Sequence, residues 1–180
     1  RASSVFWGAV ALAAFYALIR SQTGPRLALL ATLLLATDFH FILGASLARM
    51  DMMCAALGLG ALAVYVLLRQ RFLREAIVAS NTLAAAACWT HPCGILPVLG
   101  LTLLILWFDR QRLSWRWIAL GLAPYGIGIV AYSAYALQDL PSFVRQLSGN
   151  ISGFAQEAGA SGRFSGVLHP LTALRREFVD

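Results

Sequence analysis

Residues 76–108 read AIVASNTLAAAACWTHPCGILPVLGLTLLILWF and contain no Asp, Glu, Lys or Arg. As a single helix this run would be about 50 Å long, whereas the hydrocarbon core of a bilayer is roughly 30 Å thick. His91-Pro92-Cys93-Gly94 lies in the middle of the run, where Pro lacks a backbone donor and Gly permits a turn. The run therefore predicts two short helices that meet below the outer membrane surface.

The whole chain has this apolar character. It is 59% hydrophobic and only 12% charged, with a mean hydropathy of +0.72, and this composition excludes a soluble domain built around a single core. The net charge of +6 comes from arginines scattered between apolar runs. That distribution is typical of loop charge and excludes a nucleic-acid-binding patch. Because backbone groups must be paired within lipid, we expect helices rather than open strands.

The apolar runs predict an all-α, polytopic transmembrane bundle with about six spans. A helix that crosses a bilayer needs roughly 20 apolar residues. We expect the spans at about residues 3–20, 26–46, 51–68, 76–90, 93–108 and 117–138.

Residues 1–138 thus form the predicted transmembrane region, and residues 139–180 form an outer segment rich in Gly, Ser, Gln and charge. Within the outer segment, Asp139-Leu140-Pro141 predicts a short helix through Gln146, with Asp near its N-terminus and Pro in its first turn. His169-Pro170 is expected to begin a further helix. Because the chain opens at Arg1 and enters an apolar helix almost at once, we expect it to be an internal segment of a longer protein.

The arginines support the count of six spans, since short cytoplasmic loops collect basic residues. With six spans, only Arg1 and Arg49 fall in the short loops on the outer side. A single span over 76–108 would move the Arg-rich loop 109–116 to the outer side and remove the bias. The arginines on the predicted inner side are Arg20, Arg26, Arg69, Arg71, Arg74, Arg110, Arg112 and Arg116.

Arg49 and Asp51 are the first candidate site residues, in the short outer loop between the second and third predicted spans. The planar fork of an Arg suits a phosphate, and a nearby carboxylate can bind a divalent metal or orient a reacting hydroxyl. In the alternative interpretation, Asp51 caps the following helix and Arg49 extends to lipid head groups.

Asp38 and His40 form a second candidate. Asp38 is twelve residues from Arg26, which places it roughly 18 Å into the membrane if the helix is continuous. A charge at the centre of a span costs about 2.5–3.5 kcal/mol on insertion scales, so such residues usually face a cavity or a partner. Alternatively, the helix ends near Thr37 and both residues lie at the wet outer interface.

His91, in the broken run, is the third candidate. Irregular backbone at membrane depth is tolerated where protein or a wet cavity covers it. His91 there can donate to a phosphate or bind a metal, or it can be a purely structural residue beside a Pro turn. All three candidates would lie at the same outer end of the helices, where they would form one outward-facing site.

The order of these features resembles the GT-C class of membrane glycosyltransferases, in particular protein O-mannosyltransferases and bacterial aminoarabinose transferases of lipid A. The resemblance covers almost the whole chain. The residues that carry it are Ala48-Arg49-Met50-Asp51 leading into Met52-Met53-Cys54-Ala55-Ala56-Leu57, then Tyr65, the Arg69-Gln70-Arg71 loop, Thr90-His91-Pro92-Cys93-Gly94, and an outer segment after a Tyr-rich span.

The resemblance implies an integral-membrane enzyme that moves a sugar from a polyprenyl-phosphate donor to a glycan, lipid or protein acceptor on the outer side of the membrane. It places Asp51 at the acidic position associated with a divalent metal or the donor phosphate, and Arg49 beside that phosphate. His91 occupies a turn where many relatives have Thr-Lys. The catalytic base of such enzymes is an acidic residue in a loop that would precede Arg1. The implied location is the bacterial inner membrane, with the site facing the periplasm.

Two other functions are compatible with the same residues. In a transporter or permease, Asp38 would be a coupling residue near the bilayer midplane and the break at Pro92 would be a substrate site. In a non-catalytic membrane scaffold, Asp38, Asp51 and His91 would face separate surfaces.

Overall fold

The computed structural model describes residues 2–46, 50–146 and 148 of the chain, and every regular element within these ranges is a helix. The all-α prediction is therefore confirmed for this part of the chain. The helices are α1 (Ala2–Thr23), α2 (Pro25–Ala36), α3 (Phe39–Ser46), α4 (Asp51–Leu68), α5 (Leu73–Thr90), η1 (Pro92–Gly94), α6 (Ile95–Asp109), η2 (Arg110–Arg112), α7 (Trp115–Ala136) and η3 (Leu137–Asp139).

Four described segments are long and apolar enough to cross a membrane, and a bent pair would make a fifth span. The pair is α2 with α3, which the sequence predicted as one span over 26–46; the structure bends it by 64°. The helix predicted over 76–90 is present as α5, but it is not among the segments that are long and apolar enough to cross a membrane. The four segments are Ala2–Thr23, Asp51–Leu68, Pro92–Arg112 and Trp115–Gln146.

The long apolar run breaks where the sequence predicted. α5 ends at Thr90 and α6 begins at Ile95, with the short helix η1 between them. His91 adopts an extended backbone (φ −157°, ψ 144°), as expected for a residue that precedes Pro. Gly94 closes the turn against α5 so tightly that a Cβ there would overlap with the backbone of Ala87 and Cys88.

Replacing Gly94 with Ala should therefore lower the free energy of unfolding by about 3 kcal/mol, the upper end of the usual cost of overpacking, because the opposing atoms belong to a helix backbone. Gly126→Ala in α7 is a matched control, since a Cβ at Gly126 has nothing within 4 Å. Denaturant titration of both variants in mixed micelles measures the difference. Equal stabilities would contradict the tight turn.

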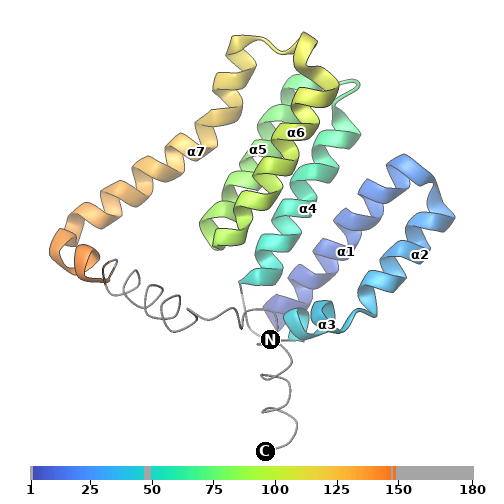
Figure 1. Cartoon of the computed structure of the whole chain (residues 1–180), viewed down its shortest axis with the longest axis horizontal. Helices are drawn as coiled ribbons and strands as arrows, with labels where there is room; N and C mark the ends of the chain where they lie inside the picture. The colour runs from blue at the N-terminus through green and yellow to red at the C-terminus, as the bar shows by residue number, and fades with distance from the viewer. Residues whose placement is uncertain (1, 47–49, 147, 149–180) are drawn as a thin grey trace, which may run out of the picture. The chain divides into compact units, whose positions relative to one another are not determined.

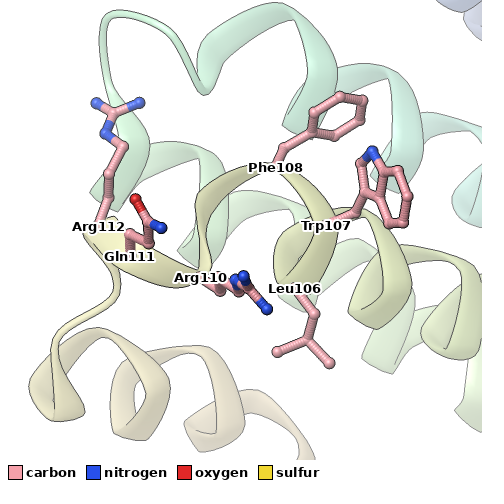
Figure 2. A pocket seen from close by; sticks show the side chains of 6 residues that line it. All are labelled: Leu106, Trp107, Phe108, Arg110, Gln111 and Arg112. Atoms are coloured by element: carbon pink, nitrogen blue, oxygen red, sulfur yellow. The ribbon is translucent and has the colours of Figure 1, made fainter.

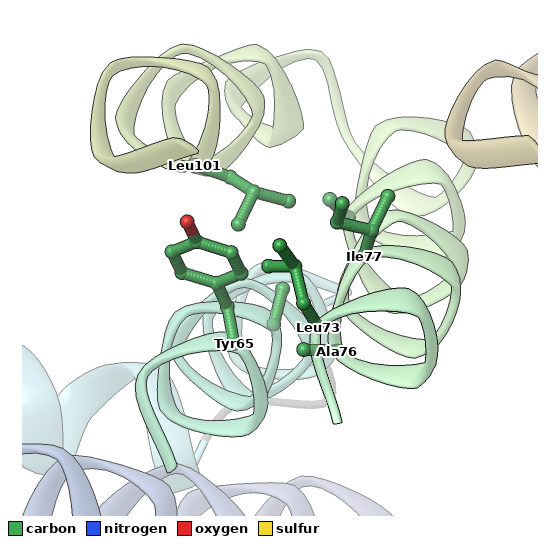
Figure 3. Packing of buried hydrophobic residues seen from close by; sticks show 7 residues of the cluster. Tyr65, Leu73, Ala76, Ile77 and Leu101 are labelled. Carbon is green, nitrogen blue, oxygen red and sulfur yellow. The ribbon is translucent and has the colours of Figure 1, made fainter. Parts of the chain in front are cut away.

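The first of two compact units comprises residues 1–130, and α4 lies at its centre. α4 packs against α1, α5 and α6. The main core fills the space between α4, α5 and α6, where Tyr65, Leu73, Ala76, Ile77 and Leu101 meet (Figure 3). Many buried positions are small residues, which lets helix backbones approach closely where lipid provides no hydrophobic driving force.

The turns α1–α2, α4–α5 and α6–α7 lie at one end of this unit, and the start of α4 and the α5–α6 break lie at the other (Figure 1). As predicted, the arginines on or beside these turns share one end. They are Arg20, Arg26, Arg69, Arg71, Arg74, Arg110, Arg112 and Arg116. The molecule is thus polarised between an arginine-rich end and an end that carries the break.

The second unit begins at Ala131. A helical segment follows η3 through Gln146, as predicted. The Asp139 carboxylate accepts a hydrogen bond from the Ser142 N–H at 3.2 Å, which satisfies one of the donors left over at a helix start. The outer segment beyond residue 148, including the helix predicted at His169, lies outside the described residues.

Candidate functional site

Asp51 and His91 come together although forty residues separate them in the sequence. Asp51 is the first residue of α4 and His91 is the residue that ends α5, so the antiparallel packing of these helices brings the two side chains to the same end. His91 Nε2 lies 3.2 Å from Asp51 Oδ1. The two side chains are 33% and 38% exposed, so the pair is open to a ligand.

The imidazole of His91 is held by both of its nitrogens. Nδ1 accepts a hydrogen bond from the Cys93 N–H at 3.2 Å, which caps the short helix η1. Because Nδ1 is an acceptor, the hydrogen of the neutral ring is on Nε2, the nitrogen that lies 3.2 Å from Asp51 Oδ1. The turn thus fixes both the tautomer and the direction of His91.

The alternative in which Asp51 caps α4 does not hold in the structure. The N-cap residue is Met50, which makes no side-chain capping hydrogen bond. Asp51 instead lies in the first turn, where the partial positive charge of the helix N-terminus stabilises a carboxylate. Its side chain is directed to His91 and to the groove described next.

A groove of about 680 Å³ begins at the Asp51–His91 pair and runs between α4 and α6. Its polar end contains Asp51 and His91 with two cysteines, and the remainder is apolar. The apolar lining consists of Ala55, Gly58, Leu59, Leu62, Leu96 and Pro97. Such a groove suits an amphiphile with a charged head and a hydrocarbon chain.

Gly58 sets the distance between the two walls of this groove. A Cβ at Gly58 would lie 2.8 Å from Pro97 Cγ, so α4 and α6 approach each other only because residue 58 has no side chain.

The described residues alone do not provide a full set of protein ligands for the metal ion predicted at Asp51. Within that part of the chain there is no group of three or more His, Cys, Asp or Glu side chains that could hold a metal ion. The Asp51 carboxylate is one possible ligand, and Mg²⁺ commonly completes its shell with water and substrate phosphate. A cation held here by the described residues would therefore have water or ligand oxygens in the rest of its shell.

Asp38 and His40, two other predicted site residues, do not line the groove. Arg49 lies outside the described residues. Asp38 and His40 are exposed, and the Asp38 carboxylate accepts a hydrogen bond from the Phe41 N–H at 2.9 Å. Asp38 therefore caps α3 at the bend after α2, which corresponds to the early end of the helix near Thr37.

A second charged cluster, which the sequence did not predict, lies at the arginine-rich end. Asp109 is only 1% exposed, although the sequence suggested an ordinary loop residue. Its Oδ2 accepts hydrogen bonds from Tyr65 Oη at 2.6 Å and from Arg69 Nη1 at 2.7 Å. Its Oδ1 accepts from Arg112 Nη1 at 3.1 Å. The carboxylate thus joins α4 to the end of α6.

The Asp109 cluster is structural rather than catalytic. Arg69 also stacks over the Phe108 ring, with 4.1 Å between the guanidinium carbon and the ring centroid. Both carboxylate oxygens accept hydrogen bonds from protein donors, and Asp109 is buried, an arrangement that suits a structural role. The sequence signal that could have revealed it is the i, i+4 spacing of Tyr65 and Arg69 on one helix face.

Comparisons with protein-family models, with curated proteins and with solved structures gave no match to this chain.

Proposed function

We propose that this chain is the membrane-embedded part of a glycosyltransferase that moves a sugar from a polyprenyl-phosphate donor to an acceptor outside the membrane. One observation carries the proposal: the Asp51–His91 pair lies at the polar end of an apolar groove at the end of the helices opposite to the arginine-rich turns. The proposal includes six spans and a GT-C-like arrangement, with α5 as the span that the other helices shield from lipid.

The chemistry of the groove matches the chemistry of the donor. A polyprenyl phosphate has a long hydrocarbon chain, which the apolar walls of α4 and α6 would accept, and an anionic head, which needs positive charge or a metal. A divalent cation bound by the Asp51 carboxylate would bridge to the phosphate, and Arg49 would pair with it from the preceding loop. His91 Nε2–H would hold the carboxylate in place.

The proposed reaction is an inverting transfer. The acceptor hydroxyl forms a bond to the anomeric carbon while the bond from that carbon to the phosphate oxygen breaks. The hydroxyl proton passes to a base, for which an acidic side chain is suited. The growing negative charge on the leaving lipid phosphate is stabilised by the cation and Arg49.

The orientation follows from the positive-inside tendency. The arginine-rich end would face the cytoplasm and the Asp51–His91 groove would face the periplasm of a bacterial inner membrane. A transporter has less support, because the Asp38 carboxylate caps α3 and lines none of the groove.

The test of this proposal is a transfer assay on the full-length protein with a labelled polyprenyl-phosphate sugar. Gly58→Ala should raise the donor KM about tenfold, since a Cβ there displaces Pro97 from the opposite wall. Gly60→Ala is the matched control on the same helix, because its Cβ would meet only Leu83 at an ordinary 3.7 Å. A wild-type donor KM in Gly58→Ala, or no transfer by the wild-type protein from any such donor, would contradict the proposal.

A further inference from the structure

A second cavity, of about 490 Å³, lies at the arginine-rich end where α6 passes into η2. Its lining changes in chemical character along the chain. The last turn of α6 contributes apolar side chains, and η2 contributes polar and cationic ones (Figure 2). The lining residues are Leu106, Trp107, Phe108, Arg110, Gln111 and Arg112.

The cavity has an excess of positive charge. Asp109, the carboxylate that precedes Arg110 in the sequence, is buried and already paired with Arg69 and Arg112. Arg110 has an exposed side chain and makes no ion pair or side-chain hydrogen bond within residues 2–46 and 50–146. Figure 2 shows its guanidinium next to Leu106, so the cationic group lies beside an apolar side chain.

The apolar side chains that line the cavity are also exposed. Trp107 is 83% exposed, an unusual exposure for an indole unless it lies at a membrane–water interface. Leu106 beside it is 51% exposed. An indole and an aliphatic side chain next to an arginine match the boundary between acyl chains and head groups.

We propose that this cavity binds the head group of an anionic phospholipid. The phosphodiester pairs with Arg110 and accepts from the Gln111 amide, Arg112 adds to the positive potential, and one acyl chain lies along Leu106 and Trp107. This site is at the opposite end of the helices from the Asp51–His91 groove and requires only that the chain spans a membrane. It therefore does not depend on the proposed transferase activity.

The experiment uses the full-length protein in nanodiscs that contain phosphatidylcholine with a small fraction of brominated phosphatidylglycerol. Bromine quenches a nearby indole, so the part of the quenching that is lost in Trp107→Phe reports this cavity. Arg110→Gln should weaken phosphatidylglycerol binding about fivefold, the effect of one arginine at a membrane surface. Arg26→Gln, an exposed arginine of another turn at the same end, is the control and should bind as the wild-type protein does.

Native mass spectrometry of the same variants counts the retained phosphatidylglycerol molecules. Loss of one tightly held lipid in Arg110→Gln but not in Arg26→Gln would support the site. Equal quenching by brominated phosphatidylcholine, displacement by millimolar inorganic phosphate, or equal lipid retention in the two arginine variants would each overturn it.

Discussion

Replacing Asp109 with Ala is expected to lower the free energy of unfolding by about 3–5 kcal/mol, the cost of removing one partner from a buried ion pair. The change leaves Arg69, which is 14% exposed, without its carboxylate and leaves the Tyr65 hydroxyl without an acceptor. The Tyr65 hydroxyl is buried and the Arg69 guanidinium is largely covered, so water replaces the lost contacts poorly. Unfolding of the purified protein in mixed micelles, followed by denaturant titration, measures the change.

Two further variants separate the buried charge from a general effect of the substitution. Glu75→Ala removes an exposed carboxylate at the same end and should change stability by no more than about 0.5 kcal/mol. The combined variant Tyr65→Phe, Arg69→Met, Asp109→Leu removes every buried member of the cluster and should regain most of the lost stability. An Asp109→Ala protein as stable as Glu75→Ala would show that the cluster does not join α4 to α6.

The Asp109 cluster also shows where sequence reasoning reached its limit. The break at His91–Gly94 could be predicted because Pro and Gly are local signals, whose effect depends only on their neighbours in the chain. The pairing of Asp109 with Arg69 joins residues forty positions apart. It depends on how closely α4 approaches α6, and that approach follows from a glycine, Gly58, meeting a proline of the other helix.

Asp51 and His91 illustrate the same difference between what the local sequence predicts and what the packing of helices determines. The sequence correctly placed Asp51 and His91 at one end of the helices, because alternating spans return the chain to the same side. His91 Nε2 lies 3.2 Å from the Asp51 carboxylate for two reasons. α4 packs antiparallel to α5, and the hydrogen bond from Cys93 N–H to Nδ1 orients the imidazole ring. For Asp38 the local signals allowed two outcomes, a continuous helix or a new N-cap, and the structure has the cap.

The sequence predicted one span over 26–46 because an average of hydropathy does not change when the helix axis changes direction. Its residues are apolar on both sides of Thr37, so a bend of 64° leaves the average unchanged. Conversely, α5 contains Ser80 and Asn81 and yet is among the most buried helices. The Asn81 amide oxygen accepts a hydrogen bond from Tyr125 Oη at 3.2 Å, so another helix rather than lipid satisfies this polar group.

Under the proposed transferase function, Asp51→Asn should reduce sugar transfer at least about 100-fold, comparable to the loss of one group that stabilises developing charge. The substitution keeps the size of the side chain and an oxygen that can still lie beside His91 Nε2. The turn, the groove and membrane insertion should therefore remain intact. What is lost is the negative charge that would hold a divalent cation against the donor phosphate.

Asp38→Asn is the matched control, since it removes another exposed carboxylate from the described residues while Asn retains the ability to cap α3. Its transfer rate should stay near that of the wild-type protein. If Asp51 acts through a cation, a chelator should abolish wild-type transfer, and Asp51→Asn should need a higher Mg²⁺ or Mn²⁺ concentration for its residual rate. If Asp51 acts without a cation, wild-type transfer should survive the chelator while Asp51→Asn stays inactive. Wild-type turnover in Asp51→Asn would remove this carboxylate from the reaction under both mechanisms, because each requires its charge.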